Sequence, residues 1–81
     1  MNEQGFVINA EQIKRNAQTV LETMRSANHA KENRDFEAYE IGMNKVNRLA
    51  FLLRQLGMDV VLCMERSAYV GLEINGSFYE V

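Results

Sequence analysis

The spacing of apolar residues changes at Gly57. In residues 10–57 they return every three or four positions, which places side chains on one face of a helix. In residues 58–81 they form short, alternating runs, which are typical of strands. The sequence therefore predicts one α+β domain over 1–81, in which a helical hairpin over 10–57 packs in two layers on an antiparallel β-meander over 58–81.

The first helix has a well-defined beginning. Asn9 is a good N-cap, and Gln12 follows three residues later, as in a capping box. The helix is expected to run from Ala10 to a point between Asn28 and Lys31. Its apolar stripe consists of Ile13, Ala17, Val20, Leu21, Met24 and Ala27.

The second helix is predicted between a polar bend over 28–35 and Gly57, which can end a helix in a left-handed conformation. Asn33 or Asp35 can cap its N-terminus. Its apolar seam is Phe36, Tyr39, Met43, Val46, Ala50 and Leu53. Its second half is apolar on nearly every side. We therefore expect this helix to be the central element, with the sheet on one side and the first helix on another.

The β-meander is set by a hairpin turn at Asn75–Gly76, a pair of residues that favours a two-residue type I′ turn. The expected strands are 58–64, 68–74 and 77–81. The turn pairs Ile74 with Ser77, Leu72 with Tyr79, and Val70 with Val81. The core face then carries Val70, Leu72, Ile74, Tyr79 and Val81, and the outer face carries Tyr69, Gly71, Glu73, Phe78 and Glu80.

The register of the first hairpin is open between two loops. A three-residue loop over 65–67 places Val60, Leu62 and Met64 on the core face, whereas a two-residue loop over 66–67 places them on the outer face. The longer loop is preferred, because it also points Asp59 and Glu65 outward. A short fourth strand at an edge, over 5–8, is the alternative to a three-stranded sheet.

Length and cysteine content limit the class of protein. A chain of 81 residues buries a limited core, and its single cysteine, Cys63, excludes an internal disulfide. One free thiol and an N-terminus without a signal-peptide pattern predict a cytoplasmic setting. The longest apolar runs are far shorter than the ~20 residues of a membrane span, so no membrane association is expected.

Charge argues against nucleic-acid binding. The formal net charge is +1 over residues 1–57 and −3 over residues 58–81, so neither block has the basic footprint that phosphate contacts require. The alternative is an accessory protein that binds nucleic acid through Lys14, Arg15, Lys45 and Arg48. It requires these four residues to converge on one face.

Catalytic and metal-binding patterns are missing from the sequence. There is no phosphate-binding glycine loop, nucleophile elbow or zinc-binding motif. His29, the only histidine, is expected in the solvated bend, without a nucleophile near it in sequence. Asp35, Glu37 and Glu40 are explained by the preference of helix N-termini for negative charge. We therefore expect a protein without catalytic residues, cofactor or metal.

Apolar residues exceed what a two-layer protomer can hide. The interface candidates are Tyr69, Phe78, Val61, Cys63, Phe51 and Leu52. A two-fold homodimer would close both patches. The sequence thus favours a small interaction module that binds itself and another protein, such as an accessory regulator or inhibitor from a bacterium or phage. The remaining alternative is a non-catalytic subunit of a larger enzyme complex.

Overall fold

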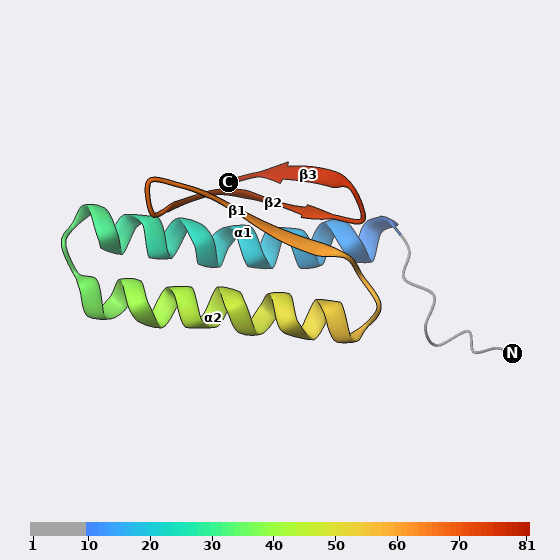
Figure 1. Cartoon of the computed structure of the whole chain (residues 1–81), viewed down its shortest axis with the longest axis horizontal. Helices are drawn as coiled ribbons and strands as arrows, with labels where there is room; N and C mark the ends of the chain where they lie inside the picture. The colour runs from blue at the N-terminus through green and yellow to red at the C-terminus, as the bar shows by residue number, and fades with distance from the viewer. Residues whose placement is uncertain (1–9) are drawn as a thin grey trace, which may run out of the picture.

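The computed structural model describes residues 10–81. Its elements are α1 (Ala10–Glu32), α2 (Phe36–Gln55), β1 (Val60–Glu65), β2 (Ala68–Ile74) and β3 (Ser77–Glu80). The two helices run antiparallel, and a three-stranded antiparallel sheet with the order β1-β2-β3 covers one side of the pair (Figure 1). This confirms the predicted α+β arrangement. The expected Asn9 cap and the alternative fourth strand over 5–8 lie outside the described residues.

α2 ends as predicted at Gly57, whose φ is +95°. The Gly57 N–H donates to the Arg54 carbonyl at 2.9 Å, and the Met58 N–H donates to the Leu53 carbonyl at 3.2 Å. These two bonds form a Schellman motif, which satisfies the last carbonyls of the helix. Met58 and Leu53 are both buried, as the apolar contact that accompanies this motif requires.

α1 ends in the same motif without a glycine, one residue beyond the predicted range. Arg34 takes the left-handed position with a φ of 59°. Its N–H donates to the Lys31 carbonyl at 3.0 Å, and the Asp35 N–H donates to the Ala30 carbonyl at 2.9 Å. The Asp35 side chain also accepts from the Ala38 N–H at 3.2 Å, so the same residue closes α1 and caps α2.

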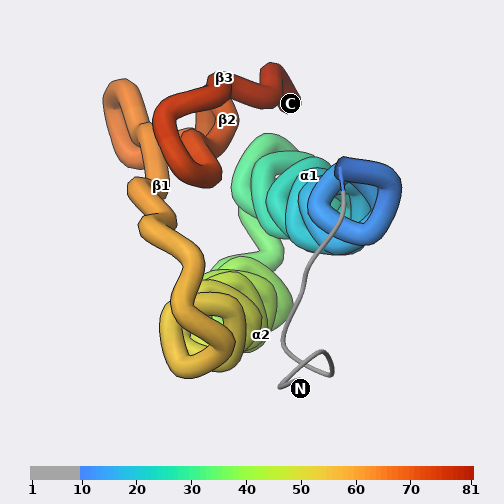
Figure 2. Tube along the Cα trace, turned by 90° about the vertical axis from the view of Figure 1, so that its right-hand side faces the viewer, coloured from blue at the N-terminus to red at the C-terminus, as the bar shows by residue number. Residues whose placement is uncertain are grey.

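The hydrophobic core lies between α1, α2 and the sheet. Its buried members are Ala17, Val20, Leu21, Met24, Ala27, Val46, Ala50, Leu53, Met58, Val60, Tyr69, Leu72 and Ile74. α1 contributes five of them and α2 three. Viewed along the helices, α1 lies beneath β2 and β3, and α2 lies to the side below β1 (Figure 2). The prediction that the second helix is central was therefore wrong, and its first seam residue, Phe36, is 61% exposed.

The second hairpin has the predicted type I′ turn and register. Asn75 and Gly76 have φ values of 52° and 88°. Ile74 lies opposite Ser77 and Leu72 opposite Tyr79. The Val81 N–H donates to the Val70 carbonyl at 2.9 Å, which extends the ladder beyond β3.

The first hairpin differs from the preferred prediction. Its loop is the two-residue one, with Arg66 and Ser67 both left-handed at φ values of 54° and 66°. Glu65 lies opposite Ala68 at the turn, and the register then shifts between Cys63 and Met64. A β-bulge thus accompanies the short loop. Because of this bulge, Val60 and Leu62 lie on the core face, where the three-residue loop was expected to place them.

The bulge also exchanges two side chains between the faces. Cys63 lies opposite Gly71 and Met64 opposite Tyr69, so Val70 has no opposite residue on β1. One unpaired residue reverses the alternation of the strand around it. Tyr69 is therefore buried at 4% exposure and Val70 is exposed, which corrects the predicted outer position of Tyr69 and the predicted core position of Val70.

Candidate interaction surfaces

Apolar side chains occupy the middle of the outer sheet face. Phe78 is 50% exposed and Val61 is 47% exposed, while Cys63 is half-buried. A Cβ atom on Gly71 would come within 2.7 Å of the Phe78 ring, so this ring lies over the glycine. The outer position predicted for Phe78 is confirmed, and Tyr69 makes no part of this surface.

Carboxylates frame this apolar centre. Glu73 lies opposite Val61 on β1 and opposite Phe78 on β3. Glu80 lies opposite Gly71 at the other end of the same face. A ligand seated on the Phe78 ring would therefore meet negative charge on more than one side.

The exposed apolar residues of α2 fall on two flanks. Phe51 is 56% exposed and Leu52 is 50% exposed. Because successive residues of a helix point about 100° apart, these two side chains belong to different surfaces. The Arg54 guanidinium reaches the Val60 carbonyl of β1, with N···O distances of 3.1 Å from Nε and 2.8 Å from Nη2. Phe51 lies one turn before Arg54 and so belongs to the flank beside β1. Leu52 points away from it.

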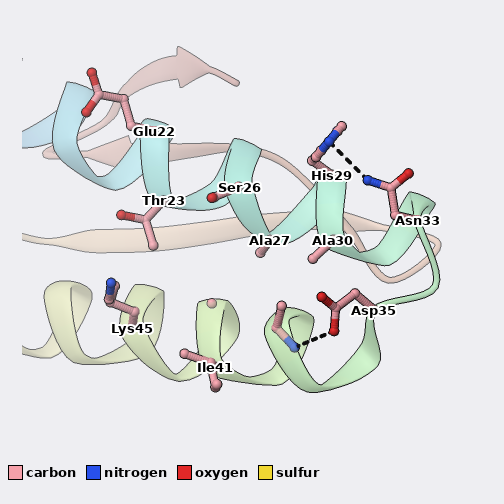
Figure 3. Close-up of a pocket in the computed structure, with 12 residues that line it drawn as sticks. Glu22, Thr23, Ser26, Ala27, His29, Ala30, Asn33, Asp35, Ile41 and Lys45 are labelled. Carbon is pink, nitrogen blue, oxygen red and sulfur yellow. Dashed lines mark hydrogen bonds between the residues drawn. The ribbon is translucent and has the colours of Figure 1, made fainter.

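An open groove of about 480 Å³ separates α1 from α2 near the helix–helix bend (Figure 3). Gly42 and Ala27 are among its lining residues, and the helices approach closely there: a Cβ atom on Gly42 would lie 2.8 Å from the Ala27 Cβ. Its polar rim includes Glu22 and Lys45, and Ile41 adds an apolar wall. Within residues 10–81 no group of three or more histidine, cysteine or acidic side chains could hold a metal ion.

His29 lies in the last turn of α1 rather than in the predicted bend, because α1 continues to Glu32. Its Nε2 is 3.0 Å from the Asn33 amide nitrogen, one turn further on. Both side chains lie at the end of the groove, away from Cys63 on the opposite face of the sheet.

The four basic residues of the nucleic-acid alternative are spread along the helices. Lys45 lines the groove at the level of Glu22 and Ser26 of α1. Arg15 lies eleven residues before Ser26, which is about 16 Å along a helix. It also forms an exposed ion pair with Glu11 at 3.7 Å.

Polar contacts that the sequence did not reveal hold the first hairpin on the helices. The Lys31 ammonium donates to the Arg66 carbonyl at 2.7 Å, and the Tyr39 hydroxyl donates to the Ser67 carbonyl at 2.5 Å. Burial, and then the neighbouring Tyr39, raise the pKa of Tyr69 above its ordinary value of 10.0. None of these contacts has a local sequence signal, since each joins segments at least 28 residues apart.

Comparison with protein-family models, curated proteins and solved structures finds no match to this chain. Of the helices in residues 10–81, neither is long and apolar enough to cross a bilayer.

Proposed function

We propose that this chain is a small, non-enzymatic interaction module that associates with itself and with another protein. The observation that carries the proposal is the exposure of large apolar side chains on several sides of so small a molecule. Phe36, Ile41, Phe51, Leu52, Leu56, Val61, Met64, Val70 and Phe78 are each at least 36% exposed. Apolar exposure on this scale is typical of interaction surfaces.

Two of these surfaces differ in charge and so suit different partners. The outer sheet face has an aromatic centre, Phe78, framed by Glu73 and Glu80. A second copy placed face to face on it would bring like charges together, which opposes association. A partner with an apolar anchor ringed by lysine or arginine fits this face, whereas self-association uses a surface without the carboxylate frame.

Sedimentation equilibrium of the full chain between 1 and 200 µM tests self-association at about the affinity range of a modest interface. The expected result is a mass that rises with concentration from one to two copies. A single-copy mass throughout this range contradicts self-association. Raising the salt from 50 to 200 mM in nucleic-acid titrations tests the alternative, because phosphate contacts weaken steeply over that range.

A further inference from the structure

Among residues 10–81, no strand pairs with the outer edge of β1. β1 is an edge strand of the sheet formed by the described residues. Asp59, just before it, faces β2, because its carbonyl accepts from the Asn75 N–H at 2.8 Å. Successive residues of a strand direct their backbone groups to opposite sides. Val60, Leu62 and Met64 therefore direct theirs away from β2.

One of these three outward positions is already occupied. The Val60 carbonyl accepts both bonds from Arg54, at 3.1 and 2.8 Å. The backbone groups of Leu62 and Met64 are left along the edge, in a strand with no charged residue between Val60 and Met64. Such an edge is a template for pairing with another strand.

We propose that β1 pairs antiparallel with β1 of a second copy, about a two-fold axis at Cys63, to give one continuous six-stranded sheet. This inference rests on the proposed self-association, and it names the surface and the register. β1 supplies the same groups from both copies, so the pairing is self-complementary, as a two-fold interface must be.

Hydrogen bonding selects the register. An axis at Cys63 pairs Leu62 of each copy with Met64 of the other, and so uses both free positions of each strand. It leaves the contact between Arg54 and Val60 in place. An axis one or two residues earlier would require the Val60 carbonyl to enter the new ladder.

Charge selects the same register. Asp59 and Glu65 lie on the outer face with Cys63, because they are separated from it by an even number of strand residues. An axis at Leu62 would place Asp59 of one copy opposite Glu65 of the other, and like charges in such pairs are destabilising. An axis at Cys63 places Glu65 opposite Val61 instead.

Side chains on the neighbouring flank of α2 complete the interface. Arg54 reaches β1, and Phe36 lies eighteen residues earlier, about five helical turns, on the same face of α2. Phe36 is 61% exposed and Phe51, one turn before Arg54, is 56% exposed. Joining the β1 edges brings this flank of one copy toward that of the other. Phe36 and Phe51 would then bury apolar surface between the copies, which a pair of strands alone does not provide.

The position of Cys63 makes the register measurable. In the proposed dimer the two Cys63 residues form a non-hydrogen-bonded pair, whose Cα atoms are about 4.5 Å apart, within reach of a disulfide. Mild oxidation of the full chain with copper phenanthroline should then produce a covalent dimer. The matched control is the Val61→Cys/Cys63→Ser variant, whose thiols would lie about 13 Å apart along the strand and should remain unlinked.

A second pair of variants tests the surface independently of cysteine chemistry. Phe51→Glu should raise the dissociation constant by about tenfold or more, because it introduces charge beside the new strand pair. Leu52→Glu changes a neighbour of similar exposure on the other flank and should stay within about twofold of the original chain. Circular dichroism checks that both variants keep their fold.

The outcomes separate the two proposals. A reversible dimer that crosslinks through Cys63 and weakens with Phe51→Glu supports the β1 pairing. A dimer that does not crosslink there, that crosslinks equally through the Val61→Cys variant, or that weakens only with Leu52→Glu overturns the pairing but leaves self-association standing. A single-copy mass at about 200 µM overturns both, because a dimer of modest affinity forms below that concentration.

Discussion

The side-chain amide of Asn28 pairs with the backbone of Tyr69 as a neighbouring strand would. Asn28 Nδ2 donates to the Tyr69 carbonyl at 2.9 Å, and the Tyr69 N–H donates to Asn28 Oδ1 at 2.9 Å. β3 pairs with β2 only from Gly71 onward, so on the side away from β1 no strand of the described residues lies beside Tyr69. A side chain of α1 thus completes the sheet beside the bulge and fixes β2 on the helix.

Asn28→Ala should lower the free energy of unfolding by about 2 kcal/mol, because it leaves a partly buried N–H and carbonyl without partners. Urea denaturation followed by circular dichroism measures the change. Asn44→Ala, at an exposed position of α2, is the control and should change stability by less than about 0.5 kcal/mol. Equal effects of the two substitutions would show that the Asn28 amide adds nothing specific.

Arg34→Gly should stabilise the protein by about 0.5–1 kcal/mol. Arg34 holds the left-handed position that ends α1, at a φ of 59°, and glycine adopts this conformation without the steric cost of a Cβ atom. Arg25→Gly, in the middle of α1, should have the opposite sign and destabilise by about 1 kcal/mol. A loss of stability with Arg34→Gly would mean that the arginine side chain contributes more than its backbone conformation costs.

Ser67→Gly should also stabilise, for a related reason at the first hairpin. Ser67 has a φ of 66° in a type I′ turn, in which glycine is preferred. Its carbonyl, which accepts from Tyr39, is retained in the variant. A gain of about 0.5–1 kcal/mol in urea denaturation is expected, and Gly76→Ser in the second hairpin should show a loss of similar size.

The two hairpins show which parts of the fold were predictable. In the second hairpin, Asn75 and Gly76 themselves favour the turn conformation, so the register of this hairpin could be predicted from these two residues. The Arg66–Ser67 turn has no such residues and is held by Lys31 and Tyr39, which lie 35 and 28 residues away from their respective acceptors. The register shift lies close to this turn, between Cys63 and Met64, and no local sequence pattern predicts it.

The candidate surfaces also divide into positions that local sequence determines and positions that long-range contacts determine. Phe78 and Val61 could be placed outward because strand alternation is local. Tyr69 could not be placed correctly, because its burial follows from the bulge and from Asn28, 41 residues away. The contact of Arg54 with Val60 distinguishes the two flanks of α2, and this contact exists only in the packed fold.

The raised pKa of Tyr69 predicts a loss of stability at alkaline pH. Below pH 10 the Tyr69 side chain is neutral in the folded and the unfolded state, so its contribution to the free energy of unfolding is fully present. As pH rises above the unfolded value of 10.0, the unfolded chain loses its proton first, and stability falls until the folded group also ionises. Urea denaturation at pH 8 and pH 11 should therefore show a smaller drop for Tyr69→Phe than for the original chain. An equal drop in the two proteins would contradict this assignment.

Phe78→Ala should separate binding from folding on the outer sheet face. The side chain is 50% exposed and covers Gly71, so its removal should cost about 1 kcal/mol of stability. Association with a protein partner should weaken by about tenfold or more, because exposed aromatic residues are common interface anchors. Leu52→Ala is the control, because Leu52 has the same 50% exposure and lies on the flank of α2 that takes part in neither proposed interface, so this association should be unchanged. A stability loss of about 3 kcal/mol or more would place Phe78 among the core residues, since buried aromatic side chains cost that much to truncate.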